Sequence, residues 1–182
     1  MNAIPDFQVL EGYEYEVLPD GVYSTDEATF YDRFVGQLPE STTREDIYGG
    51  FMRLRGESRE RGIRATQWID GSFVESKPDP EDVDVVTFCD YDELNALRDE
   101  NQRFVAERLA GGEATKMLYK THTFLVPSCN SDHEYYAVFE HCRAYWRTWF
   151  GTARTGQRKG ITEMAIGDPN QAPRISHARV EA

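Results

Sequence analysis

The chain has 182 residues, with 20 Lys and Arg against 32 Asp and Glu, which gives a formal net charge of −12. Hydrophobic residues make up 40% and aromatic residues 13%, which is too apolar for a disordered chain and enough for the core of one domain. No apolar run approaches the roughly 18 residues of a membrane helix, and the N-terminus lacks the pattern of a signal peptide. The three cysteines have no CxxC spacing, which argues against a disulfide framework or a zinc site. We therefore expect a soluble cytoplasmic protein with no membrane partner.

The charge is unevenly distributed along the chain. Residues 1–100 carry 9 basic and 24 acidic side chains, whereas residues 101–182 carry 11 basic and 8 acidic ones. An acidic surface repels polyanions, so long double-stranded DNA is not an expected partner. The segment 141–162 has basic side chains and no acidic one. It is compatible with a phosphate-bearing substrate, and equally with an unevenly charged solvated surface.

The first third of the chain is predicted to be mainly helical. Residues 1–22 are rich in Tyr, Pro and Gly and are expected to be irregular or to contain short extended structure. Cap residues and apolar spacing predict a helix over 24–35, and the same signals predict a second helix over 41–60. Gly62 ends that helix.

The remaining elements alternate between strands and helices. Strands are predicted over 64–69, 82–88, 116–126 and 160–166, and helices over 90–110 and 133–150. This order favours an α+β fold, in which helices flank a small mixed sheet. We expect a single domain over 1–182, with a helical N-terminal part (1–62), a core sheet (63–166) and a tail (167–182).

The segment 67–86 carries the chemistry. Gly71 and Ser72 stand where a strand ends, and a glycine turn with backbone N–H groups and a hydroxyl can hold phosphate oxygens. Asp82 and Asp84 are two residues apart on the next predicted strand, so their carboxylates project from one face about 7 Å apart. Mg²⁺ usually binds one or two carboxylates together with substrate phosphates. A Gly-Ser pair or a DxD alone is common by chance, and the combination in this order is what favours a site.

This combination resembles a known signature. The order of these parts is similar to the signature of the polymerase-β-like nucleotidyltransferase superfamily. That order is a strand, a Gly-Ser pair, about ten residues, and then a DxD that begins an apolar strand. The stretch from Trp68 to Val74 resembles small bacterial and phage nucleotidyltransferase-like proteins, as do residues 18–22 and 150–161. The resemblance implies that Gly71 and Ser72 bind a nucleoside triphosphate, and that Asp82 and Asp84 bind Mg²⁺.

One position departs from that signature. Active members of the superfamily generally carry a third carboxylate on a later strand, and the matching strand here contains no acid but has His122. Histidine is a poor ligand for Mg²⁺. Three alternatives follow: another acid such as Glu134 or Glu163 substitutes, His122 acts as the base, or catalysis is lost. A fourth is that His122 is a hydrogen-bonded strand residue without a role.

Further candidates have ordinary explanations of equal weight. Arg154, Arg158 and Lys159 lie in a glycine-rich segment that could close over phosphates or be a solvated loop, and Lys77 is another phosphate candidate. Cys129 near a histidine has no nucleophile signature. The aromatic residues of 135–149 are more typical of a core than of a base-stacking surface.

Two functional hypotheses result. The first is a Mg²⁺-dependent nucleotidyltransferase that moves a nucleotide from a nucleoside triphosphate to a hydroxyl acceptor, with RNA or protein as possible acceptors. The second is a catalytically inactive module of the same fold that binds a nucleotide or a protein partner, for example in a toxin–antitoxin or phage-conflict system. The Gly-Ser and DxD pattern favours the first, and His122 favours the second.

Overall fold

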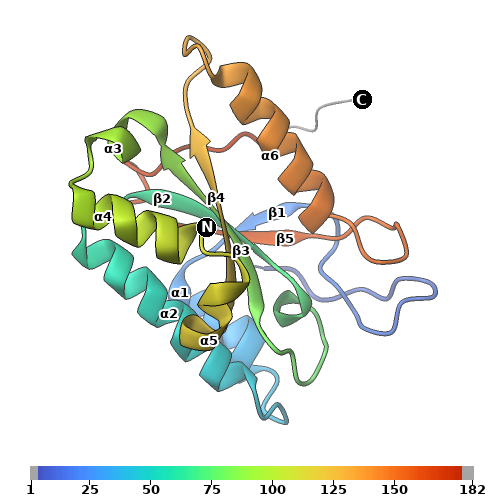
Figure 1. Cartoon of the computed structure of the whole chain (residues 1–182). Helices are drawn as coiled ribbons and strands as arrows, with labels where there is room; N and C mark the ends of the chain where they lie inside the picture. The colour runs from blue at the N-terminus through green and yellow to red at the C-terminus, as the bar shows by residue number, and fades with distance from the viewer. Residues whose placement is uncertain (1–3, 178–182) are drawn as a thin grey trace.

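The computed structural model describes residues 4–177, which form one five-stranded mixed sheet with helices on both faces (Figure 1). This confirms the predicted α+β class. The strand order is β1-β5-β2-β3-β4. β2 runs antiparallel to both neighbours, whereas β1 with β5 and β3 with β4 are parallel pairs. The strands are β1 (Val22–Ser24), β2 (Ala65–Asp70), β3 (Val83–Asp90), β4 (Thr121–Ser128) and β5 (Ile161–Ile166).

Figure 1 shows α6 on one face of the sheet and α1, α2 and α4 on the other. Two cores result, since side chains alternate across each strand. Trp68 and Phe88 pack with α6, while Ile69 and Val85 pack with the helices of the opposite face. No helix of the described residues is long and apolar enough to span a membrane. The helices are α1 (Glu27–Tyr31), α2 (Arg44–Glu60), α3 (Tyr91–Ala96), α4 (Asp99–Phe104), α5 (Lys116–Tyr119) and α6 (Tyr136–Phe150).

Two predicted elements are wrong in their boundaries. The helix expected over 90–110 is broken at Leu97 and Arg98, whose backbones are extended. The break allows Leu94 of α3 and Phe104 of α4 to reach the same apolar cluster. The strand expected over 116–126 begins only at Thr121, because 116–119 form α5 and Lys120 takes a left-handed conformation with φ +53°.

The two ends of the chain contribute more than predicted. Within the part expected to be helical, Val22–Ser24 form β1 and pair with β5. The expected tail packs on the sheet as far as it is described: Ile175 is buried beside α6, and Thr66 donates a hydrogen bond to the carbonyl of Pro173. Residues 178–182 of that tail lie outside the described residues.

The aromatic residues near α6 divide into two groups. Phe139 is buried and Trp146 half-buried in the apolar cluster on this face, as predicted for a core. Tyr135, Tyr145 and Trp149 are exposed, so the core prediction is wrong for them. Tyr145 and Trp149 are four residues apart and therefore share one face of α6, which the sheet does not cover.

Candidate functional site

Three neighbouring strands bring the motif residues together. Asp70, the last residue of β2, is opposite Asp84 on β3, and Asp84 is in turn opposite His122 on β4. His122 Nδ1 lies 3.2 Å from Asp84 Oδ1. The side chain that joins Asp84 from the neighbouring strand is therefore the histidine that the sequence singled out.

Gly71 packs directly against the carboxylate of Asp84. Its φ of +82° is a conformation that favours glycine, and a Cβ atom there would lie 2.3 Å from Asp84 Oδ2. Ser72 begins a short 3₁₀ turn that ends at Val74. Gly71 and Ser72 are both partly exposed, so a ligand can reach them. The glycine is thus required both by the turn and by the close approach of the acid.

Asp82 precedes β3 by one residue, so the expectation that both acids lie within the strand is corrected. Its Oδ2 atom is 2.7 Å from Nζ of Lys116, which also lies 3.1 Å from Glu113. Burial, and after it the charge of Asp82, raises the pKa of Asp84, while His122 and Lys116 lower it. Asp82 and Asp84 are therefore a like-charge pair that Lys116 partly neutralises.

The turn after Gly71 is held by one arginine. The guanidinium of Arg44 is buried and donates to the carbonyls of Phe34, Phe73, Glu75 and Lys77. Burial lowers its pKa to about 10, so it stays charged at neutral pH. Because one rigid group satisfies several carbonyls of the segment 72–77, the backbone beside Gly71 has little freedom to move.

Lys159 fastens the other side of this turn, and the structure corrects its predicted role. Its ammonium is buried, 2.9 Å from Asp70 and 2.7 Å from Glu75. Burial raises the pKa of Asp70 to about 6, because the charged carboxylate loses its contact with water, and this effect exceeds the lowering of the pKa by Lys159. The two carboxylates in turn raise the pKa of Lys159. Lys159 therefore links two segments and does not face a phosphate.

The other basic candidates are less fixed. Lys77 is half-buried in the segment held by Arg44, and its carbonyl accepts one of the arginine's hydrogen bonds. Arg154 and Arg158 are exposed on a turn closed by a backbone bridge between Thr152 and Arg158. The structure leaves these three basic side chains available to a ligand.

Neither alternative acid replaces a third carboxylate. Glu163 lies on β5, which β2 separates from β3. It accepts hydrogen bonds from Trp68 and Ser24. Glu134 is exposed just before α6. It follows the C-terminal end of β4, whereas His122 lies at the N-terminal end of that strand. Both acids therefore lie outside the group formed by Gly71, Asp84 and His122.

The acid pair fits Mg²⁺ in part. Asp82 and Asp84 supply carboxylate oxygens, the ligands that Mg²⁺ prefers, and their mutual repulsion favours a shared cation. Among residues 4–177 no group of three or more His, Cys, Asp and Glu side chains could hold a metal by itself. The residues therefore suit an ion held jointly with substrate phosphates, in which the two acids are its protein ligands.

Comparison with known proteins places the chain in a family. A family model described as a family of unknown function, DUF6932, matches residues 10–165. The chain belongs to this family. The match spans β1 to β4 and all but the last residue of β5, both segments that hold the turn, and the complete group around Asp84. No curated protein and no solved structure matches the chain.

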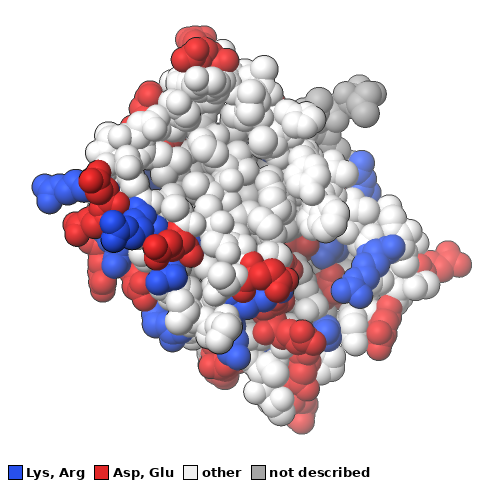
Figure 2. Space-filling model, in the orientation of Figure 1, with Lys and Arg blue, Asp and Glu red and all other residues white. Residues whose placement is uncertain are grey.

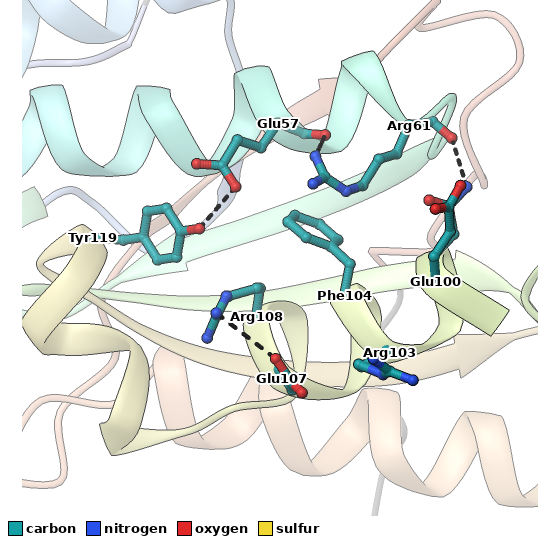
Figure 3. Close-up of a pocket in the computed structure, with 9 residues that line it drawn as sticks. Glu57, Arg61, Glu100, Arg103, Phe104, Glu107, Arg108 and Tyr119 are labelled. Atoms are coloured by element: carbon teal, nitrogen blue, oxygen red, sulfur yellow. Dashed lines mark hydrogen bonds and ion pairs between the residues drawn. The ribbon is translucent and has the colours of Figure 1, made fainter.

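A groove of the surface lies apart from the acid pair. This groove of about 380 Å³ is formed between α2 and α4, with Tyr119 at one end (Figure 3). Arg61 lies over the ring of Phe104, and Tyr119 donates a hydrogen bond to Glu57. Its acidic and basic side chains alternate and partly pair with one another (Figure 3). The groove therefore presents no single charge to a ligand, and the acid pair remains the stronger candidate site.

Sequence reasoning missed Arg44 and Lys116. Arg44 is one of many arginines in the predicted second helix, and no local pattern marks one that becomes buried. Lys116 was assigned to a strand, where it would not have been placed beside Asp82. The available signal was Gly111-Gly112 before it, a pair that can precede a short helical turn as well as a strand, whereas no local pattern marks the end of that turn at Lys120.

Proposed function

We propose that this chain binds a nucleoside triphosphate and transfers its nucleotidyl group to a hydroxyl acceptor. The observation that supports this is the position of Asp84 on β3, between Gly71, which follows β2, and His122 on β4. The turn at Gly71 and Ser72 offers backbone N–H groups and a hydroxyl to phosphates. The carboxylates of Asp82 and Asp84 are the proposed ligands of a metal. Arg44 and Lys159 hold the turn in this arrangement.

The proposed reaction forms a bond between the acceptor oxygen and the α-phosphorus of the triphosphate. The bond from that phosphorus to the bridging oxygen of the β-phosphate breaks, and pyrophosphate leaves. Mg²⁺, when bound, supplies positive charge that stabilises the phosphate oxygens. Asp84 holds Nδ1 of His122, which leaves Nε2 to accept the proton of the acceptor hydroxyl. His122 thereby takes the place of the third carboxylate.

A second candidate is a nucleotide-binding or protein-binding module without catalysis. It is favoured by the observation that both acids already have basic partners in the chain, Lys116 for Asp82 and His122 for Asp84. Such a module keeps the turn at Gly71 and does not need the imidazole of His122 as a base. The two candidates differ in whether a nucleotide is transferred.

The binding test is calorimetric titration with ATP and with GTP in the presence of Mg²⁺. We expect the wild type to bind, and Asp84→Asn to bind at least tenfold more weakly. Glu81→Gln is the matched control, because it removes one negative charge from an exposed residue next to Asp82. Equal binding by wild type and Asp84→Asn would remove the support for this site.

The transfer test uses nucleoside triphosphates labelled at the α-phosphate, with short RNA and with cell protein as acceptors. We expect label on an acceptor with the wild type and with Glu81→Gln, and none with Asp84→Asn. His122→Asn is expected to bind nucleotide normally and to transfer it much more slowly. Nucleotide binding without transfer to any acceptor would favour the non-catalytic module.

A further inference from the structure

A second groove of the surface, with a volume of about 320 Å³, lies between β4 and α6. Its helical wall extends from Tyr135, just before α6, to Trp146. A helix rises about 1.5 Å per residue, so these two residues are about 16 Å apart along the axis and the groove is elongated. Its volume is at the lower end of the range for small-molecule sites.

The walls of this groove are almost entirely apolar. Leu125 and Val126 of β4 line it together with Val138 and Phe139 of α6, and no charged side chain is among the lining residues. Val138 is 61% exposed, which leaves a large apolar side chain in contact with water. Contiguous apolar surface of this kind is typical of a binding site. A matching ligand therefore has an apolar body.

Aromatic rings gather at one end of the groove. Tyr91, at the start of α3, and Tyr135 both line it, and their ring centroids are 5.2 Å apart. The ring of His133 lies 4.9 Å from that of Tyr91. Its Nδ1 atom accepts a hydrogen bond from the N–H of Tyr135, so this nitrogen carries no proton and the ring is neutral. The faces of tyrosine rings are partly negative and attract cations.

The same end carries acidic side chains. Burial, and after it the charges of Asp90 and Asp92, raises the pKa of Cys129, which lines the groove. The charge of Glu134 raises the pKa of Tyr135. None of these three acids has an ion-pair partner within residues 4–177. Their negative charges therefore act on the ring-lined end of the groove.

The charges at this end do not cancel. The segments that form it, 78–97 and 121–142, contain no Lys or Arg. The N-termini of α3 and α6 add about half a positive charge each, against three carboxylates. Figure 2 shows a face over β4 and α6 with almost no Lys or Arg, and acidic side chains at its upper end, where β4 leads into α6. This end therefore favours a cation and repels an anion.

We propose that the groove binds a small organic cation with an elongated apolar body, such as a hydrophobic amine or a quaternary ammonium. Its charged group lies against the rings of Tyr91 and Tyr135, and its body extends along α6 toward Trp146. A lysine or arginine side chain of a partner protein fits less well, because its short aliphatic stem covers only part of the groove. The site is separate from the acid pair and does not depend on the proposed function.

The test is calorimetric titration with three probes that share one alkyl chain: octyltrimethylammonium, 1-octanol and octanesulfonate, each below its micelle-forming concentration. We expect the cation to bind at least tenfold more tightly than the sulfonate. Asp92→Asn combined with Glu134→Gln should weaken binding of the cation about fivefold and leave binding of the alcohol unchanged, because two exposed charges are lost. Glu40→Gln combined with Glu60→Gln is the matched control, since it removes two exposed charges elsewhere.

Two cysteines locate the bound cation. Cys129 and Cys142 line the groove and are half-buried, whereas Cys89 is buried. We expect octyltrimethylammonium to slow the alkylation of Cys129 and Cys142 by N-ethylmaleimide, which mass spectrometry of peptides measures for each thiol.

Three results would overturn the proposal. The first is equal affinity for the cation and the sulfonate, and the second is binding of the cation that leaves both thiols as reactive as before. The third is a wild type that sediments as a dimer and whose Cys129 and Cys142 are unreactive without any probe, because a second copy of the chain would then occupy the groove.

Discussion

The segments on the two sides of Asp84, the turn after β2 and the residues at the start of β4, are held in place by side chains of very different exposure. On the β2 side, the turn at Gly71 is fastened by Arg44 and Lys159, whose side chains are almost completely buried. On the β4 side, the acids meet His122 and Lys116, whose side chains are 21% and 32% exposed. Removing a buried charged partner costs several kcal/mol, whereas an exposed ion pair contributes at most about 1 kcal/mol. The β2 side is therefore preorganised, and the β4 side can exchange partners when a ligand binds.

The largest loss of stability is expected when Arg44, which holds the turn on the β2 side, is replaced. Arg44→Met removes the donor of three buried carbonyls and of the part-buried carbonyl of Lys77, and we expect the free energy of unfolding to fall by about 4 kcal/mol. Urea unfolding measures this. Arg53→Met, an exposed change on the same helix, should cost less than about 1 kcal/mol. A similar small loss for both variants would mean that the turn does not depend on Arg44.

A smaller effect is expected from the buried acid of the same side. The pKa of Asp70 is about 6 in the folded protein, above its ordinary value of 3.8, so the folded chain binds a proton that the unfolded chain does not bind. This contribution to stability is present at low pH and is lost as pH rises through 6. Between pH 7 and pH 5 we expect the free energy of unfolding to rise by about 1 kcal/mol.

The control for this pH dependence is a pair of variants. Asp70→Asn should abolish the rise between pH 7 and pH 5, while Glu81→Gln, an exposed change outside the buried group, should keep it. Thermal unfolding over this pH range provides the measurement. A wild type whose free energy of unfolding falls as the pH is lowered from 7 to 5 would contradict the raised pKa of Asp70.

The smallest effect is expected on the β4 side. Lys116→Met removes the ammonium that would compete with the proposed metal for Asp82, so we expect Mn²⁺ to bind up to about fivefold more tightly in the absence of nucleotide. Electron paramagnetic resonance of free Mn²⁺ measures the affinity directly. Lys120→Met is the control, since Lys120 pairs with the exposed Asp46. Unchanged or weaker Mn²⁺ binding by Lys116→Met would show that the ammonium does not occupy the metal side of Asp82.

The sequence predicted the part of the site that depends on local pattern. A run rich in β-branched residues located β3, and turn residues located Gly71 at the end of β2. The antiparallel pairing of these two strands in the structure places the turn beside Asp84. The predicted neighbour on a third strand, His122, is likewise found opposite Asp84. The positions of the two strands follow from local pattern, whereas the position of His122 follows from the resemblance to the nucleotidyltransferase signature.

What the sequence could not provide was the tertiary partner of each charged side chain. Lys159 has the same local context as Arg158, yet one is buried between two acids and the other is exposed. Which of them turns inward depends on Asp70 and Glu75, more than 80 residues earlier in the chain. The left-handed Lys120, which separates α5 from β4, is also set by packing, because Tyr119 before it is anchored on α2 by Glu57.

The register that places His122 opposite Asp84 has an evolutionary consequence. Codons for histidine and aspartate differ in one base, so a single point mutation at this position would give the sheet a third carboxylate beside Asp84. The same step in reverse removes it. One substitution at residue 122 therefore separates the present sheet from one with a third carboxylate, with no change in the strands that present it.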